Sequence, residues 1–339
     1  MSASTIKDIA RETGLSPATI SKYLNGGSVR PDNRAAIQAA IEKYDYHPNE
    51  AARSVRGVSR KMIAVVIPSA YANYCRDIFL TCQQLLLGHK YGTLLINYNN
   101  DPEHEQHAVS NALNNSISGI ISIPMDIDAE CYQRARKNGT PLVFLHSSEL
   151  PDAHNIVLND HNSISEVIAA LCDGGHTRIG LISGTTEQHI ANQRIEIFKK
   201  LLKSHNCPLA EDMIYTSNGA PWDVGYEGME YMISSGRRPT AVICLNSGLL
   251  LGAKMAALEH RLRIPSDISI AGMTESIMTE SPLLRNITSV SYPINAAAEE
   301  AVRIIMKNIE TRRKGEPDEL VTTGFNAQTH WAGSIATLT

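Results

Sequence analysis

The 339-residue sequence lacks the motifs by which many enzymes are recognised. It contains no G-x-G-x-x-G or P-loop segment for a nucleotide, and no G-x-S-x-G or H-E-x-x-H for hydrolysis. These absences favour a protein that binds its targets without transforming them. We therefore expect no enzymatic activity and no cofactor.

The sequence also lacks clustered cysteines and long apolar runs. Its six cysteines form no C-x-x-C pair, which predicts reduced thiols packed like small hydrophobic residues and no metal site. No apolar run approaches the ~20 residues of a membrane span, and the N-terminus has no apolar signal segment. We expect a cytoplasmic protein that makes no contact with a membrane.

The net charge of −4 conceals an uneven distribution. Residues 1–61 hold 10 Lys+Arg against 6 Asp+Glu, a balance of +4, whereas the remainder holds 21 against 29, a balance of −8. A basic N-terminal part on an acidic body suits a protein that contacts polyanionic DNA through one end.

Residues 5–25, TIKDIARETGLSPATISKYLN, have the pattern of two short helices around a tight turn. Gly14 is suited to end the first helix because glycine adopts the left-handed conformation without strain. Ser16 can cap the second helix, and Pro17 fits its first position. The second helix then presents small, hydroxylated or cationic side chains outward, as a helix in a DNA major groove requires: Ala18, Thr19, Ser21 and Lys22.

A third helix is predicted from about Pro31 to Tyr44, with its core face formed by Ala36, Ile37, Ala40, Ile41 and Tyr44. After the Tyr46-His47-Pro48-Asn49 break, residues 50–56 have a helix-forming composition but only about two turns of length. Such a short helix is marginal alone in water.

The segments TIKDIARETGLSPATISKYLNG and YDYHPNEAARSV resemble the N-terminal part of the LacI/GalR family of bacterial transcription regulators. The resemblance implies a helix-turn-helix domain at residues 1–48 and a hinge helix and linker at 49–61. The hinge helix would fold when two copies meet on DNA, with Val55 as a minor-groove wedge where the family usually has leucine. The resemblance assigns DNA contacts to Thr5, Ser16, Pro17, Ala18, Thr19, Ser21, Lys22, Asn25, Asn33, Arg34, Ala52, Arg53 and Val55.

From residue 62 onward, short apolar runs alternate with helical stretches. Strands are predicted at 62–67, 93–97, 119–123, 141–145, 179–182, 213–216, 241–245, 269–271 and 288–293. Helices are predicted at 77–88, 103–114, 128–138, 162–173, 189–204, 223–234, 248–259 and 295–310. Fully apolar strands alternating with helices predict parallel sheets covered on both faces.

The segments at 175–184 and 237–253 resemble the family's second lobe, and the resemblance implies a fold similar to periplasmic sugar-binding proteins. The body at 62–339 is then an effector-binding and dimerisation region of two doubly wound lobes. We expect the first lobe at about 62–159 and 292–322, and the second at about 160–291 and 323–339. A cleft is expected between them, at the carboxyl ends of the strands.

In the cleft the resemblance is weaker. Arg194 matches a family arginine that holds a polar effector, but Ser247 and Thr274 stand where the family has aspartates. The resemblance implies an effector site formed by Tyr74, His146, Arg194, Trp222, Ser247 and Thr274. Either Arg194 and His146 face a carboxylate or phosphate of an anionic ligand, or the site has lost its ligand and Arg194 pairs with an acid across the cleft.

These observations predict a homodimeric, sequence-specific DNA-binding regulator that acts on a near-palindromic operator in the nucleoid. We expect such a regulator to be a repressor controlled by a small polar or anionic metabolite. The alternative is a regulator with a degenerate cleft that answers to a partner protein. A solute-binding protein for transport is disfavoured, since it has no use for residues 5–55.

Overall fold

A computed structural model of the chain describes residues 5–24, 27–46, 61–70, 72–115, 117–146, 152–184, 189–207, 210–275 and 281–338. The chain divides into two compact units, Met1–Arg60 and Lys61–Thr339, which we call the head and the body. The hinge residues Ala52, Arg53 and Val55, and Asn25 in the head, lie outside the described residues.

In the described part of the head there are three helices, α1 (Ile6–Thr13), α2 (Pro17–Leu24) and α3 (Pro31–Lys43). Gly14 follows α1 with a φ of 67°, so the predicted left-handed turn is confirmed. The core of the head is small and consists of Ile9, Ile20, Ile37, Ala40 and Tyr46, with partly buried apolar side chains around it.

The predicted core face of α3 was wrong at two positions. Ala36 is exposed, and Tyr44 is 38% exposed because it follows the helix and its hydroxyl donates to Glu12 on α1. Tyr46 fills the core in place of Tyr44.

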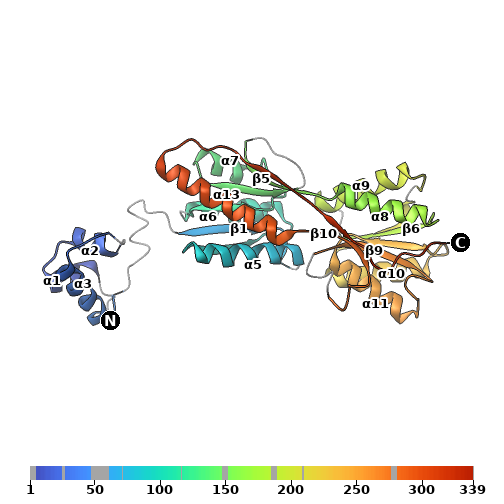
Figure 1. The fold of residues 1–339 in the computed structure, drawn as a ribbon, viewed down its shortest axis with the longest axis horizontal. Coiled ribbons are helices and arrows are strands. Elements are labelled where there is room, and N and C mark those ends of the chain that lie inside the picture. Colours follow the sequence, from blue (N-terminus) through green and yellow to red (C-terminus); the bar gives the residue numbers. More distant parts are fainter. Residues whose placement is uncertain are drawn as a thin grey trace. The chain divides into compact units, whose positions relative to one another are not determined.

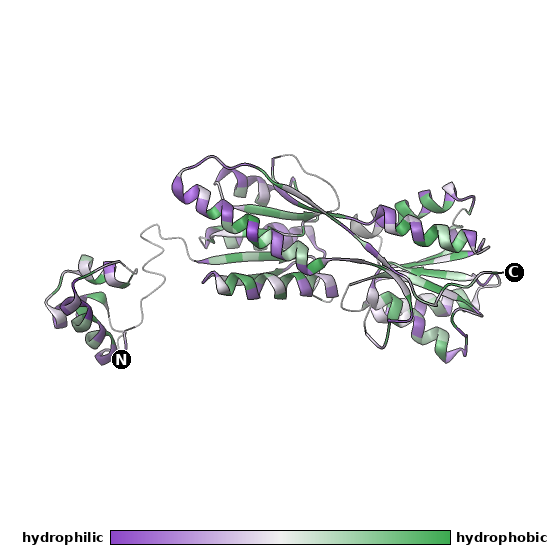
Figure 2. Ribbon diagram, in the orientation of Figure 1, coloured by the Kyte–Doolittle hydropathy of each residue, from purple (hydrophilic) through white to green (hydrophobic). Residues whose placement is uncertain are grey.

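The first lobe of the body is built on a parallel six-stranded sheet with the order β11-β5-β4-β3-β1-β2. Its strands are β1 (Met62–Ile67), β2 (Gly92–Asn97), β3 (Gly119–Ser122), β4 (Leu142–His146), β5 (His154–Asn159) and β11 (Thr322–Asn326). One face packs on α5 (Asn73–Gly88) and α13 (Ile294–Lys314), the other on α6 (Pro102–Asn114) and α7 (Glu130–Lys137). The two covered faces explain why β1, β3 and β4 are almost entirely apolar (Figure 2).

The second lobe has a six-stranded sheet with the order β12-β10-β9-β8-β6-β7, in which only the β10–β12 pair is antiparallel. Its strands are β6 (Ile179–Ser183), β7 (Ile214–Thr216), β8 (Ala241–Cys244), β9 (Ser269–Glu275), β10 (Thr288–Tyr292) and β12 (Gln328–His330). Among the residues that the structure describes, the helices of this lobe are α8 (His161–Asp173), α9 (His189–Ser204), α10 (Pro221–Ser234) and α11 (Ser247–Glu259), with a short 3-10 turn at Glu211–Met213.

The chain passes between the two lobes three times, as Figure 1 shows. The first crossing follows β5 at Asp160, the second follows β10 at Pro293, and the third lies at Ala327 between β11 and β12. β11 therefore carries the first lobe as far as Asn326, beyond the boundary expected at about residue 322.

The six cysteines are free thiols, and all except the half-buried Cys172 are buried. Within the described ranges, none of the helices has both the length and the apolar character needed to cross a membrane.

Candidate functional site

The outer surface of the head is set by local capping interactions. Ser16 accepts a hydrogen bond from the Thr19 backbone nitrogen at 3.2 Å, and its hydroxyl lies 2.9 Å from that of Thr19. Thr5 forms a capping box with Asp8, in which the Thr5 backbone nitrogen donates to the Asp8 carboxylate at 2.9 Å. The Thr5 hydroxyl also donates to this carboxylate, at 2.7 Å. These bonds lower the pKa of Asp8 below its ordinary range.

Nine of the residues assigned to DNA lie in the described part of the head. Pro17, Ala18, Lys22 and Arg34 are exposed, as are Thr5 and Ser16, whereas Thr19, Ser21 and Asn33 are half-buried. Lys22 projects from the last turn of α2, where its backbone oxygen accepts from the Gly27 nitrogen at 2.8 Å. Ile20 is fully buried, which holds the opposite face of α2 against the core.

The body contains a cavity of about 760 Å³ between its two lobes. The first lobe lines it with the segments that follow β1, β2 and β3, and the second with those that follow β6, β7 and β8. The cavity thus lies at the carboxyl ends of parallel strands in both sheets, where α/β proteins bind their ligands.

Four of the six residues assigned to the effector line this cavity: Tyr74, Arg194, Trp222 and Ser247. Thr274 does not. It is 6% exposed within β9 and pairs in register with Ser291 of β10. The backbone of His146 ends β4, and its side chain lies outside the described part of the chain.

Arg194 on α9 contacts three groups, two of which lie at or beside the crossings between the lobes. Its Nε lies 3.8 Å from Asp160 Oδ2, one Nη donates to the Tyr292 hydroxyl at 3.3 Å, and the other donates to the Leu245 carbonyl at 3.4 Å. The Tyr292 hydroxyl also donates to Asp160. Burial alone lowers the pKa of Arg194, but Tyr292 and Asp160 together outweigh it, and the pKa rises above its ordinary value.

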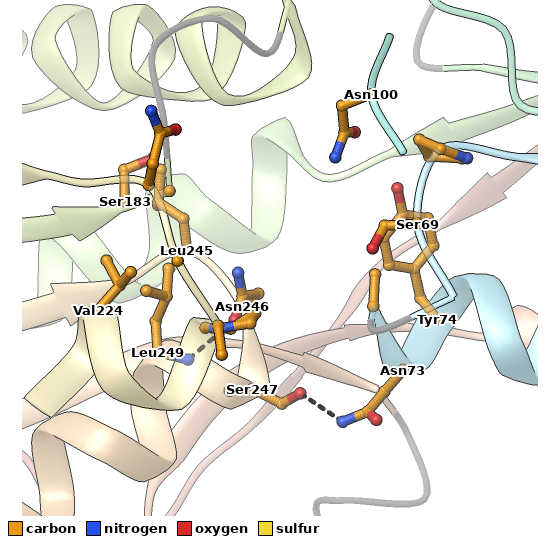
Figure 3. A pocket seen from close by; sticks show the side chains of 18 of the residues that line it. Ser69, Asn73, Tyr74, Asn100, Ser183, Val224, Leu245, Asn246, Ser247 and Leu249 are labelled. Carbon is orange, nitrogen blue, oxygen red and sulfur yellow. Dashed lines mark hydrogen bonds between the residues drawn. The ribbon is translucent and has the colours of Figure 1, made fainter. Parts of the chain in front are cut away.

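Several neutral polar residues of the cavity were missed by the sequence analysis. Asn73 at the start of α5 donates to Ser247 Oγ at 3.0 Å, which joins the two lobes (Figure 3). Ser183 ends β6, is fully buried, and its hydroxyl has no hydrogen-bond partner among the described residues. Asn99 and Asn100 both adopt positive φ, at 53° and 57°, which asparagine tolerates better than most residues. In the sequence, only the positions of these polar residues at or after the ends of strands could have indicated that they line a binding site.

Behind the first-lobe wall of the cavity lies a buried acid, Glu105 on α6. It is 1% exposed and accepts from the Tyr132 hydroxyl at 2.6 Å and from the Met125 nitrogen at 3.2 Å. Burial raises its pKa to about 7, although these hydrogen bonds oppose the rise. Because Met125 lines the cavity, this carboxyl group supports the wall from behind.

Two family models match the chain. The model described as "Bacterial regulatory proteins, lacI family" matches residues 5–49, and "Periplasmic binding protein-like domain" matches residues 168–326. The first corresponds to the helices of the head, and the second begins in α8 and ends with β11 of the body.

Known proteins are similar to this chain over almost its entire length. Catabolite control protein A of Priestia megaterium is 27% identical over 89% of this chain and 92% of its own. The HTH-type transcriptional repressor PurR of Actinobacillus pleuropneumoniae is 26% identical over 90% of this chain and 91% of its own. The fold is similar to that of the lac repressor dimer bound to operator and the anti-inducer ONPF, with a TM-score of 0.82 at 21% identity over 99% of this chain and 100% of that one.

Proposed function

Because this chain belongs to the lacI family of bacterial regulatory proteins, we propose that it represses transcription as a homodimer on a near-palindromic operator. We further propose that a small polar molecule, bound in the cavity of the body, controls operator binding. The pairing of a helix-turn-helix head with a cavity at the strand ends of a two-lobed body carries both parts of the proposal.

The surface of α2 supports sequence-specific DNA binding. Pro17 and Ala18 let the start of the helix approach closely, whereas Lys22 supplies a cation able to donate to a base edge. Arg34 on α3 is exposed and suited to a phosphate. A head of about 60 residues contacts few base pairs, so two copies are needed for tight and specific binding.

An apolar surface on the first lobe supports dimer formation. On α5, Leu80 is 50% exposed and Leu87 is 73% exposed. Beside this helix, β2 is the edge strand of its sheet, and Leu94 and Leu95 are 36% and 40% exposed on its two faces. An exposed edge strand with adjacent leucines favours association with a second copy.

The polar contact between the lobes supports control by a ligand. The Asn73–Ser247 hydrogen bond joins the two lobes at the lining of the cavity, so a molecule bound beside it contacts a group that links them. Such a molecule changes the relative stability of the lobe arrangements whenever it binds one of them better than the other.

Selection from random duplex DNA followed by sequencing tests the proposal. We expect the full-length protein to enrich a near-palindrome whose half-sites are one helical turn apart, and a metabolite panel to include a compound that shifts operator affinity at least about tenfold. Enrichment of an unpaired single site contradicts the dimer, and an operator affinity that no metabolite alters contradicts ligand control.

A further inference from the structure

We infer that Asp160, a residue outside the cavity lining, sets the charge selectivity of the cavity: it neutralises Arg194, so the cavity takes an uncharged polar ligand and rejects anions. The inference rests on the proposed function, because it names the chemical class of the effector. It replaces the expectation that Arg194 faces an anionic group of the ligand.

The lining of the cavity carries little charge. Arg194 is the single ionised side chain among the lining residues that the structure describes. The remaining polar lining residues are asparagines, serines and tyrosines, including Asn73, Asn100, Asn246 and Ser183. A site for an anion ordinarily uses a cation whose charge is available to the ligand.

The charge of Arg194 is already matched. Asp160 Oδ2 lies 3.8 Å from Nε, and Tyr292 bonds to both groups, so the carboxylate, hydroxyl and guanidinium form one closed set. The side chains of Arg194 and Asp160 are only 21% and 13% exposed, so water screens their attraction weakly. A ligand anion would have to approach Arg194 in the presence of the Asp160 charge and would be repelled by it.

The neutral groups offer a different kind of recognition. Asn246 accepts from the Leu249 nitrogen through Oδ1 at 2.9 Å, and its amide nitrogen takes no part in that bond. Asn73 donates to Ser247 through its amide nitrogen, and that bond does not use its oxygen. The Ser183 hydroxyl has no hydrogen-bond partner in the part of the chain that the structure describes, and together with these groups it can donate and accept without any ionic charge. Figure 3 shows Asn73, Tyr74 and Asn100 from the first lobe facing Ser183, Asn246 and Ser247 from the second.

The ligand that fits is therefore uncharged, carries both donors and acceptors, and has an apolar face for the aromatic rings. Tyr74 lines one side of the cavity, and the 47% exposed Trp222 lines the other. An amide-rich lining recognises hydroxyl, carbonyl and amide groups, since each asparagine supplies a donor and an acceptor.

Asp160→Asn gives a direct test, because it removes one negative charge at nearly constant shape. Inorganic phosphate serves as the probe, titrated into the full-length protein at constant ionic strength while thermal unfolding is followed. We expect no saturable stabilisation of the wild type beyond that of its Arg194→Met variant. We expect Asp160→Asn to bind phosphate at least about tenfold more tightly than the wild type does, and Arg194→Met in that background to remove the gain.

Three further variants separate the charge effect from general damage. Asp267→Asn breaks an exposed ion pair with Arg263 elsewhere in the body and should leave the phosphate response unchanged. Asp160→Glu keeps the carboxylate and should show no stabilisation by phosphate beyond that of the wild type. Any phosphate bound by the basic head is common to all variants and does not affect the comparison. If Asp160→Asn fails to fold, Tyr292→Phe removes the hydroxyl that joins the two groups and should show a smaller gain.

Saturable phosphate binding by the wild type that Arg194→Met abolishes would overturn the inference, as would the absence of a gain in both Asp160→Asn and Tyr292→Phe. Matched compounds, such as glucose with glucose 6-phosphate and adenosine with its monophosphate, extend the test. A phosphorylated member that binds more tightly through Arg194 refutes the inference but leaves ligand control intact. Operator binding that responds to no compound refutes the proposed ligand control, while the phosphate titration still reports the charge of the cavity.

Discussion

Lys22 and Arg34 are exposed cations on different helices of the head, and we expect their replacement to have different effects. Lys22→Ala should cost about 1–3 kcal/mol of operator binding and relax sequence preference in each half-site, because a base contact carries sequence information. Arg34→Ala should weaken binding to all sequences alike and reduce the salt dependence by about one released ion.

Fluorescence anisotropy with the selected operator and a scrambled duplex, each at several salt concentrations, measures both effects. Lys314→Ala at the end of α13 removes an exposed cation from the body and serves as the control. If Lys22→Ala lowers the affinity for the operator and for the scrambled duplex equally, Lys22 does not read a base.

Glu105 makes the stability of the body depend on pH. Its pKa is about 7 in the folded protein against an ordinary 4.5, because burial disfavours the charged form. The folded state therefore holds the proton more tightly than the unfolded chain. The resulting stabilisation is fully present below about pH 4.5 and is lost as the pH rises through 7, a change of at most about 3 kcal/mol.

Urea unfolding of the wild type and Glu105→Gln at a series of pH values between 4.5 and 8 measures this contribution. The variant should lose the decline in unfolding free energy, since glutamine keeps the acceptor for Met125 without a titrating proton. Glu299→Gln, an exposed change on α13, should retain the decline. A wild type whose stability does not fall across this interval would contradict the assignment.

The residues of the cavity were only partly predictable from the sequence. Tyr74, Trp222 and Ser247 follow strands or begin helices, so their places in the lining agree with the general location of α/β binding sites. The partner of Arg194 could not be found in this way. Asp160 reaches it only because the first crossing and α9 meet in space, and no local pattern encodes that contact.

At the scale of elements, the second lobe depends on a close contact between α10 and α11. A Cβ atom at Gly252 would lie 1.9 Å from the Trp222 carbonyl oxygen, and one at Gly225 would lie 2.1 Å from the Leu249 carbonyl oxygen. We expect Gly252→Ala to lower the unfolding free energy by at least about 1–3 kcal/mol, because the two backbones must separate. The ligand response should weaken as well, since Trp222 and Leu249 both line the cavity.

Chemical unfolding and the ligand-induced change in operator affinity provide the two measurements. Gly236→Ala is the matched control, because a Cβ at Gly236 meets no atom within 4 Å. This control should be neutral or slightly stabilising, as alanine restricts the unfolded chain more than glycine does. Normal stability of Gly252→Ala would show that the helices can separate without cost.

Most elements of the body were predicted because buried parallel strands carry continuous apolar runs. Three strands were missed. β11 alternates between exposed and half-buried residues at the edge of its sheet, β12 has only three residues, and β5 begins with the polar pair His154 and Asn155. The burial of these two side chains depends on hydrogen bonds, including one from the Val321 nitrogen to His154, which a local pattern does not reveal.

At the scale of the whole molecule, the proposed dimer should depend on the apolar surface of α5 and β2. Leu87 is 73% exposed, so Leu87→Lys should leave the fold of one copy unchanged while placing two charges in the proposed interface. We expect weaker association and a loss of operator affinity of at least about tenfold, because each monomer then binds a single half-site.

Sedimentation equilibrium and operator titration measure the two effects. Leu320→Lys, at a 54% exposed leucine outside α5 and β2, is the matched control. A Leu87→Lys protein that remains dimeric would place the interface elsewhere on the body.

The third crossing also has a consequence during translation. Asn155 of β5 and Thr322 of β11 are neighbours in one sheet but lie 167 residues apart in the chain. A ribosome that adds about 5–20 residues per second therefore completes the head roughly 15–50 seconds before it delivers β11. During that interval the nascent chain carries a finished head and an unfinished body. We expect deletion of the last residues of β11 to impair both lobes. This strand completes the sheet of the first lobe, and it also leads the chain back into the second lobe.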